Sequence, residues 1–298
     1  MPRRGPVVIE ALLDTDRRHE YNFAFIDEGA KREVRRALLK AVAMPGHQVP
    51  FASRELPVAR GWGTGGLQIT MSIIGPDDLL KVIDQGSDAS VNAVNLRKLL
   101  TRTTGVNTTF DSTEESVLQS RHRIPEIPLR DDQITVLQVP LPEPLRIVER
   151  RETETRRMHA EQDYSKMYVY LYEDIVRNGL ISLAAGYPVR VNRSYIMSPS
   201  PIPKWDIHRL HRVPNLTLLG AGREKRVYAV PPYTDVEPLQ FEDVRFAPES
   251  FEGKRCSRCG AEDTFLEESY NETTGEPVYT CSDTGYCDSR VQGRGGAS

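Results

Sequence analysis

The sequence has 298 residues, of which 39% are hydrophobic and 27% charged, and its formal net charge is −3. These values are typical of a globular chain with one large or two small domains, and they exclude a disordered or fibrous protein. The small net charge argues against a nucleic-acid-binding protein. Because no apolar run approaches the roughly 20 residues that cross a bilayer, and the N-terminus lacks a signal peptide's apolar region, we expect a cytoplasmic protein without membrane contact.

The clearest helical pattern lies near the N-terminus, after an extension at residues 1–20 to which we assign no role. Residues 27–43 place small and apolar side chains at helical spacing, with Asp27 as a possible N-cap. Pro45 and Gly46 follow and can end this helix. By this pattern alone, Gly46 is a helix-terminating glycine.

A glycine-rich run, GWGTGG, occupies residues 61–66 and precedes an alternating segment, residues 67–74, that predicts a strand. A P-loop or dinucleotide fingerprint instead follows a strand and opens a helix. The run could therefore be a flexible turn, or its backbone amides could line a phosphate. The following segments predict helices over residues 77–85 and 90–101.

The composition changes at Ile124, where prolines alternate with apolar residues and a charge run follows. This pattern favours edge strands and connectors. Residues 164–178 predict a helix closed by Gly179, and two strands are expected before residue 198. We interpret residues 125–204 as an inserted subdomain or docking surface, with 21–124 and 205–250 forming the core domain. His122 and His159 have no partner nearby in sequence, so we interpret them as solvated or structural.

A second glycine element, TLLGAGREKR at residues 217–226, leads into a strand. Its amides, together with Arg223, Lys225 and Arg226, could bind an anion. The alternative is a hairpin turn whose charges face solvent.

All four cysteines lie near the C-terminus with the spacing C-x2-C-x21-C-x5-C: Cys256, Cys259, Cys281 and Cys287. In a reducing compartment such clustering indicates a shared metal rather than disulfides. Two strands predicted between the pairs favour a structural zinc hairpin. The five-residue loop before Cys287 allows another reading, in which three cysteines hold a 4Fe-4S cluster and the fourth is free for chemistry.

The expected fold is therefore mixed α+β, with a small C-terminal Cys-rich β-hairpin metal module at residues 251–290 and a flexible tail at 291–298. Several longer strings carry a resemblance: YNFAFIDE (21–28), LLKAVAMPGHQVPF (38–51), GWGTGG (61–66), KVIDQG (81–86), TGVNTT (104–109), RHRIPE (121–126), RETETR (151–156), GAGREKR (220–226) and CSDTGYC (281–287). From Tyr21 to Cys287 the chain resembles the catalytic subunits of bacterial carbon-phosphorus lyase, the alpha-D-ribose 1-methylphosphonate 5-phosphate C-P-lyases of phosphonate catabolism.

This resemblance implies a radical enzyme that uses S-adenosyl-L-methionine. Cys256, Cys259 and Cys281 take the positions that bind a 4Fe-4S cluster, whose open iron binds the methionine part of the cofactor. The resulting 5'-deoxyadenosyl radical takes a hydrogen atom from Gly46, and the glycyl radical then generates a thiyl radical on Cys287. The implied products are an alkane, methane, and ribose 1,2-cyclic phosphate 5-phosphate.

The resemblance also implies partners: the other subunits of a C-P lyase core complex and an ATP-binding-cassette subunit, for which residues 125–204 are the expected docking surface. Because the substrate carries phosphonate and phosphate groups, GWGTGG and GAGREKR are candidate anion sites. In protein prepared in air, zinc with Cys287 as its fourth ligand is the alternative occupant of the cysteines. The competing hypothesis is a non-catalytic zinc-ribbon scaffold subunit of a phosphonate-degrading complex.

Overall fold

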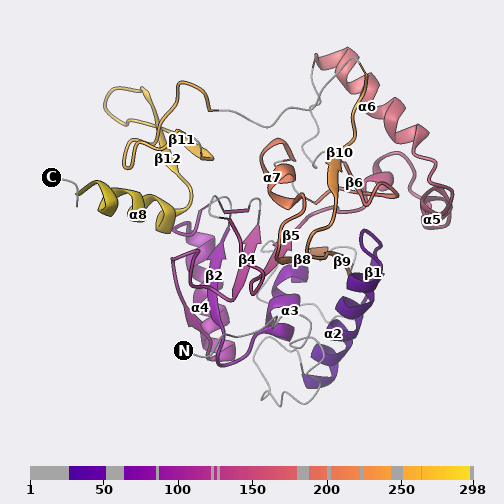
Figure 1. Cartoon of the computed structure of the whole chain (residues 1–298), viewed down its shortest axis with the longest axis horizontal. Helices are drawn as coiled ribbons and strands as arrows, with labels where there is room; N and C mark the ends of the chain where they lie inside the picture. The colour runs from indigo at the N-terminus through magenta and orange to yellow at the C-terminus, as the bar shows by residue number, and fades with distance from the viewer. Residues whose placement is uncertain are drawn as a thin grey trace.

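The computed structural model describes residues 27–51, 64–84, 87–121, 124–125, 128–179, 188–199, 203–221, 225–242, 251–262 and 264–295. These residues form a mixed α+β fold with a seven-stranded sheet, a three-stranded sheet and a two-stranded hairpin (Figure 1). The predicted fold class is confirmed. Among the helices in these ranges, none is both long and apolar enough to span a membrane.

The large sheet has the strand order β1-β9-β8-β5-β4-β2-β3. Its strands are β1 (Val49–Pro50), β2 (Leu79–Ile83), β3 (Asn107–Thr108), β4 (Val117–Arg121), β5 (Ile134–Gln138), β8 (Leu216–Ala221) and β9 (Arg226–Val230). The strands β3, β2, β4, β5 and β8 run parallel to one another. Strand β9 pairs antiparallel with β8, and β1 pairs antiparallel with β9. The strands β5, β8 and β9 are buried at every residue, as expected for strands covered on both faces.

Strand β5 corrects the prediction of edge strands and connectors for the proline-rich segment. It lies in the middle of the large sheet, between β4 and β8. The nearest prolines, Pro128 and Pro140, flank the strand and do not interrupt it. Every residue of β5 can therefore donate its N–H to the sheet, and its five residues fill a central position.

Three helices cover one face of the sheet: α2 (Glu28–Ala43), α3 (Thr64–Ile73) and α4 (Val91–Thr104) (Figure 1). The predicted helices 27–43 and 90–101 are confirmed as α2 and α4. Asp27 caps α2 by accepting a hydrogen bond from the Ala30 N–H at 2.7 Å. Ser90 caps α4 in the same way, and Gly105 ends it in the left-handed conformation. These helices and the sheet enclose one apolar core.

Two predictions in this layer were wrong. Residues 67–74, predicted as a strand, form most of α3, and residues 77–85, predicted as a helix, contain β2. The physical reason is burial: residues 65–74 are all buried, and β2 is buried from Leu80 onward. Neither segment therefore has the regularly spaced polar residues by which a helix is distinguished from a strand. The glycine-rich run therefore leads into a helix, although its residues 61–63 lie outside the described part of the chain.

The first turn of α3 lies directly against β8. A Cβ atom on Gly220 would approach the Gly66 backbone nitrogen to 2.5 Å, so only glycine permits this contact. The two glycine motifs of the sequence thus meet at one place in the fold.

The other face of the sheet carries a second layer with its own apolar core. This layer contains η1 (Pro144–Ile147), α5 (Glu152–Glu161), α6 (Ser165–Asn178), β6 (Val189–Val191), β7 (Tyr195–Met197), α7 (Pro203–Leu210) and β10 (Val236–Pro238). The predicted helix 164–178 is confirmed as α6, with Gly179 ending it at a φ of +71°. The two predicted strands are confirmed as β6 and β7, which pair with β10 in the order β10-β6-β7.

The C-terminal module consists of β11 (Leu266–Tyr270), β12 (Pro277–Cys281) and α8 (Thr284–Gly295). Its two strands form the predicted antiparallel hairpin, with Leu266 opposite Cys281. The loop predicted before Cys287 is wrong, because α8 begins at Thr284 and already contains Cys287. Asp283 accounts for this start: its side chain accepts a hydrogen bond from the Tyr286 N–H at 3.0 Å, as an N-cap does.

Candidate metal centre

The four cysteine sulfur atoms gather at one point in the C-terminal module. All four Sγ atoms lie within 4.8 Å of one another. The Cys256–Cys287 separation is 3.8 Å and the Cys259–Cys281 separation is 3.5 Å, and none of the four forms a disulfide. The shared ligand site predicted from their spacing is therefore present in the fold.

Each sulfur is placed by a different local structure. Cys256 and Cys259 lie in a tight turn, in which the Gly260 N–H donates to the Cys256 carbonyl at 2.8 Å. Cys281 ends β12, and Cys287 lies in the first turn of α8, where its N–H donates to the Asp283 carbonyl at 3.0 Å. Cys256, Cys259 and Cys287 are buried, while Cys281 is half-buried. The cluster is thus almost entirely removed from water.

Electrostatics favour a cation among these sulfurs. Burial raises the pKa of Cys256, but backbone N–H groups of Cys259 and Cys281 donate to its sulfur and bring that pKa down to about 6. Burial and the nearby Cys256 sulfur raise the pKa of Cys287 to about 12, and burial raises the pKa of Cys281 further. Four thiolates can share this space only if a positive ion balances their charge.

The spacing fits a single four-coordinate ion. Zinc–sulfur bonds of about 2.3 Å place the corners of a tetrahedron about 3.8 Å apart, close to the two separations above. A 4Fe-4S cluster keeps its thiolate ligands farther apart, because a cube of iron and sulfide lies between them. Thiolates can bind either a zinc ion or a 4Fe-4S cluster, but the observed sulfur separations do not match the cluster. To hold a cluster, the sulfur atoms of Cys256, Cys259 and Cys281 would have to lie farther apart, and Cys287 would have to move away from them.

Gly46 lies far from this centre. It follows α2 at the β1 edge of the sheet, with a φ of +84°, and its N–H donates to the Ala229 carbonyl at 3.4 Å. The cysteine module instead contacts β2 through α8. Five strand-to-strand steps separate β1 from β2, which amounts to roughly 24 Å. The fold therefore brings the four cysteines together but does not bring Gly46 to them.

The surroundings of Gly46 contain residues that sequence reasoning missed. The Tyr195 ring lies between the rings of His47 and His159, with centroid separations of 4.1 and 3.9 Å. A Cβ atom on Gly46 would approach Tyr195 Cδ1 to 2.9 Å. His159 is buried and lies 2.9 Å from a Glu143 oxygen through Nε2, in keeping with a structural role. His122 lies outside the described residues. No local motif signals this group, because its members come from separate parts of the chain.

The two glycine motifs give little support to an anion site. In the second motif Arg226 pairs with Glu152 at 2.8 Å, and β8 and β9 pair antiparallel as the alternative hairpin requires, although Arg226 is buried and does not face solvent. Arg223 lies outside the described residues. In the first motif the Gly66 N–H already donates to Gln138 Oε1 at 2.5 Å.

Sequence analysis also missed Lys81, whose side chain reaches the cysteine module. A lysine within the apolar run LLKVI was a usable signal.

The fold and site define a mixed α+β protein with a buried four-cysteine site able to bind a metal. A family model described as phosphonate metabolism protein PhnJ matches residues 19–293, and the chain belongs to this family. A Rhizobium meliloti (strain 1021) protein named alpha-D-ribose 1-methylphosphonate 5-phosphate C-P-lyase is 55% identical over 278 residues, covering 93% of each chain. An Escherichia coli (strain K12) protein with the corresponding name is 55% identical over 267 residues, covering 90% of this chain and 95% of its own.

Proposed function

We propose that this protein is a carbon-phosphorus lyase that cleaves alpha-D-ribose 1-methylphosphonate 5-phosphate by radical chemistry dependent on S-adenosyl-L-methionine. The observation that carries the lyase activity in this proposal is the 55% identity, over nearly the whole chain, to two proteins named as C-P lyases of this substrate. The gathered cysteines support it, because they provide a site for an inorganic centre. The proposed products are methane and ribose 1,2-cyclic phosphate 5-phosphate.

In the proposed active state, Cys256, Cys259 and Cys281 hold a 4Fe-4S cluster. When bound, the cluster and S-adenosyl-L-methionine supply a carbon-centred radical that can take a hydrogen atom. The closed arrangement of four sulfurs corresponds to a resting site with one ion, in which Cys287 is the fourth ligand. Because Cys287 lies on a separate element, α8, Cys287 and the hairpin that carries Cys281 can move apart without either element unfolding.

Gly46 and Cys287 carry the radical in this proposal. A glycine Cα–H suits the first role, because the resulting radical is shared with the flanking amides and no side chain covers it. The Cys287 S–H bond is weak and gives its hydrogen atom to Gly46. The Cys287 sulfur then bonds to phosphorus, and the carbon–phosphorus bond breaks homolytically. The methyl radical takes this hydrogen atom back from Gly46 and leaves as methane, which restores the radical on Gly46. The ribose 2-hydroxyl displaces the Cys287 sulfur to close the cyclic phosphate, and its proton passes to that sulfur.

Hydrogen transfer between Gly46 and Cys287 requires an approach that the isolated chain does not show. We include partner subunits in the proposal for this reason. Residues 125–204, interpreted from the sequence as a docking surface, contain the exposed apolar residues Val169, Tyr172 and Val176 on α6. Their spacing places them along one side of that helix, as a face that binds another protein would require.

Anaerobic reconstitution with iron and sulfide tests the proposal. We expect the wild-type chain, assembled with its partners and reduced, to cleave S-adenosyl-L-methionine and release methane from the phosphonate. Cys287→Ala should keep the iron and the cofactor cleavage but release no methane. The zinc-ribbon scaffold hypothesis expects the reverse: no iron uptake under any condition, and unfolding of the module in Cys287→Ala. Iron and sulfide content, methane and cofactor cleavage distinguish the two.

A further inference from the structure

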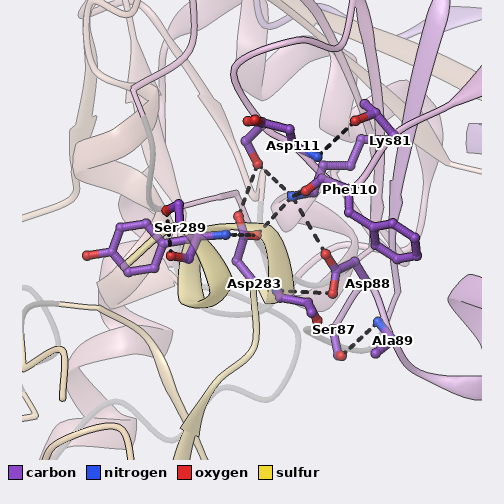
Figure 2. A network of polar contacts seen from close by, with 12 residues as sticks. Lys81, Ser87, Asp88, Ala89, Phe110, Asp111, Asp283 and Ser289 are labelled. Carbon is purple, nitrogen blue, oxygen red and sulfur yellow. Dashed lines mark hydrogen bonds and ion pairs between the residues drawn. The ribbon is translucent and has the colours of Figure 1, made fainter. Parts of the chain in front are cut away.

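A fully buried lysine connects the large sheet with the cysteine module. Lys81 lies in the middle of β2, and its side chain has no exposed surface. Its ammonium group donates to the Phe110 carbonyl and to Ser112 Oγ, both at 2.7 Å, and to Asp283 Oδ1 at 2.9 Å (Figure 2). These three bonds use all three ammonium donors. Because side chains alternate along a strand, Lys81 lies on the face of the sheet opposite to Leu80 and Val82.

Asp283 is the residue just before α8 and acts as its N-cap. One of its carboxylate oxygens accepts from Lys81 and from the Tyr286 N–H, and the other accepts from Ser112 Oγ at 3.1 Å. Its carbonyl accepts from the Cys287 N–H at 3.0 Å. A single residue therefore joins β2 to the helical turn that carries the last cysteine.

Two further contacts hold the same turn from other directions. Asp88, which precedes α4, accepts from the Thr284 N–H at 3.1 Å and lies 3.7 Å from the Lys81 ammonium. A Cβ atom on Gly285 would approach the Phe110 carbonyl oxygen to 2.0 Å, so the turn touches this loop too closely for any side chain. Lys81 lies between Asp88 and Asp283 and balances two buried carboxylates (Figure 2).

We infer that Lys81 is a positioning residue for the metal centre: through Asp283 it fixes the first turn of α8 on the sheet and so sets where the Cys287 sulfur lies. The other three cysteines belong to the hairpin and its neighbouring turn, which Lys81 does not touch. The centre is thus assembled from two parts, and Lys81 and Asp283 attach the part with Cys287 to the core of the protein. This inference depends on the four-cysteine site and not on the proposed lyase chemistry.

A direct consequence is that α8 stays in place when the metal is removed. The contacts described above that hold its first turn come from Lys81, Ser112 and Asp88, and these contacts involve no sulfur. Loss of Lys81 leaves Asp283 buried without its counter-charge and leaves Asp88 with only the more distant charge of Arg97, which favours separation of α8 from the sheet.

Lys81→Met tests this role in the full-length chain, using zinc alone as the metal probe. We expect the variant to label Cys287 with iodoacetamide on the order of tenfold faster or more than wild type, and to lose zinc sooner to a chelator. Hydrogen exchange should rise in α8 and stay unchanged in α2 and β8. Lys31→Met is the matched control, because Lys31 is also buried and pairs with Glu28 in α2. It should leave labelling and zinc retention as in wild type.

Gly285→Ala probes the same contact without a buried charge, so it serves if Lys81→Met fails to fold. The new Cβ should push α8 away from the Phe110 loop and expose Cys287 in the same way. Gly293→Ala lies on the same helix with nothing within 4 Å, and it should change neither exchange nor labelling. Folded Gly285→Ala with wild-type Cys287 labelling and wild-type exchange in α8 would overturn the inference, as would the same result for folded Lys81→Met.

Discussion

Gly46 and Gly105 adopt similar backbone conformations in different surroundings. Their φ values are +84° and +73°, but a Cβ on Gly46 would meet the Tyr195 ring while one on Gly105 would meet nothing within 4 Å. Both substitutions to alanine should therefore cost about 1 kcal/mol of backbone strain. Gly46→Ala should cost a further 1–3 kcal/mol or so through overpacking against Tyr195. Urea unfolding of both variants measures the difference, and equal losses would contradict the contact.

The same pair separates stability from the proposed radical role. If Gly46 carries the radical, Gly46→Ala should release no methane even at temperatures where it is fully folded. Gly105→Ala should retain activity in proportion to its folded fraction.

The sequence shows that position 46 ends a helix, but its neighbour Tyr195 is distant in the chain and no local pattern reveals it. The ion pair between Lys81 and Asp283 was hidden for the same reason, whereas the cysteines were found because all four lie in one stretch of the chain, residues 256–287.

At the scale of elements, prediction succeeded where a helix has one solvent face and local caps. The helices α2, α4 and α6 each bury one side and end at a glycine or proline-glycine signal, so their period is visible in the sequence. It failed for α3 and β2, because both are buried on nearly all sides and their apolar runs carry no period. The hairpin β11–β12 was found because its turn, residues 271–276, is polar and contains Gly275.

That hairpin should depend on the metal. Three of the five buried residues in the small core around this hairpin are cysteines. The five are Cys256, Cys259, Ala261, Leu266 and Cys287. A two-stranded hairpin with so few apolar contacts is marginally stable, so metal binding supplies much of its folding free energy. Chelation should therefore raise hydrogen exchange across residues 251–281 to near the unfolded rate while the seven-stranded sheet stays protected. Unchanged exchange in the hairpin after complete metal loss would show that the protein core alone stabilises it.

For the whole molecule, the large sheet determines how far apart the two proposed radical residues lie. The second layer covers the β8 and β9 end of one face, and α8 is fixed at the β2 end of the same face through Lys81. Gly46 lies between α2 and β1 at the first end, and Cys287 lies in α8 at the second end; Figure 1 shows α2 and α8 at these two ends. This arrangement follows from strand order, and strand order comes from pairings between distant segments, which explains why the sequence did not reveal it.

The stability of the whole chain should also depend on pH through Glu115, a buried residue just before β4. Burial raises the pKa of Glu115 from near 4.5 to about 7, despite opposing effects of its own backbone and of Lys81 and Arg130. The folded state therefore holds this proton at pH values where the unfolded state has released it. The contribution of Glu115 to stability is complete below about pH 4.5 and is lost as the pH rises to about 7.

Glu115→Gln removes this titration. The variant should match wild type near pH 4.5 and exceed its free energy of unfolding by about 3 kcal/mol at pH 8, because each unit of pKa shift corresponds to about 1.4 kcal/mol. Glu114→Gln is the control, because the Glu114 side chain is next in sequence to Glu115 but exposed. The stability of this variant should follow the wild-type pH curve. Urea midpoints between pH 4.5 and 8 give the comparison. A difference between Glu115→Gln and wild type that stays constant with pH would show that Glu115 is already ionised in the folded protein.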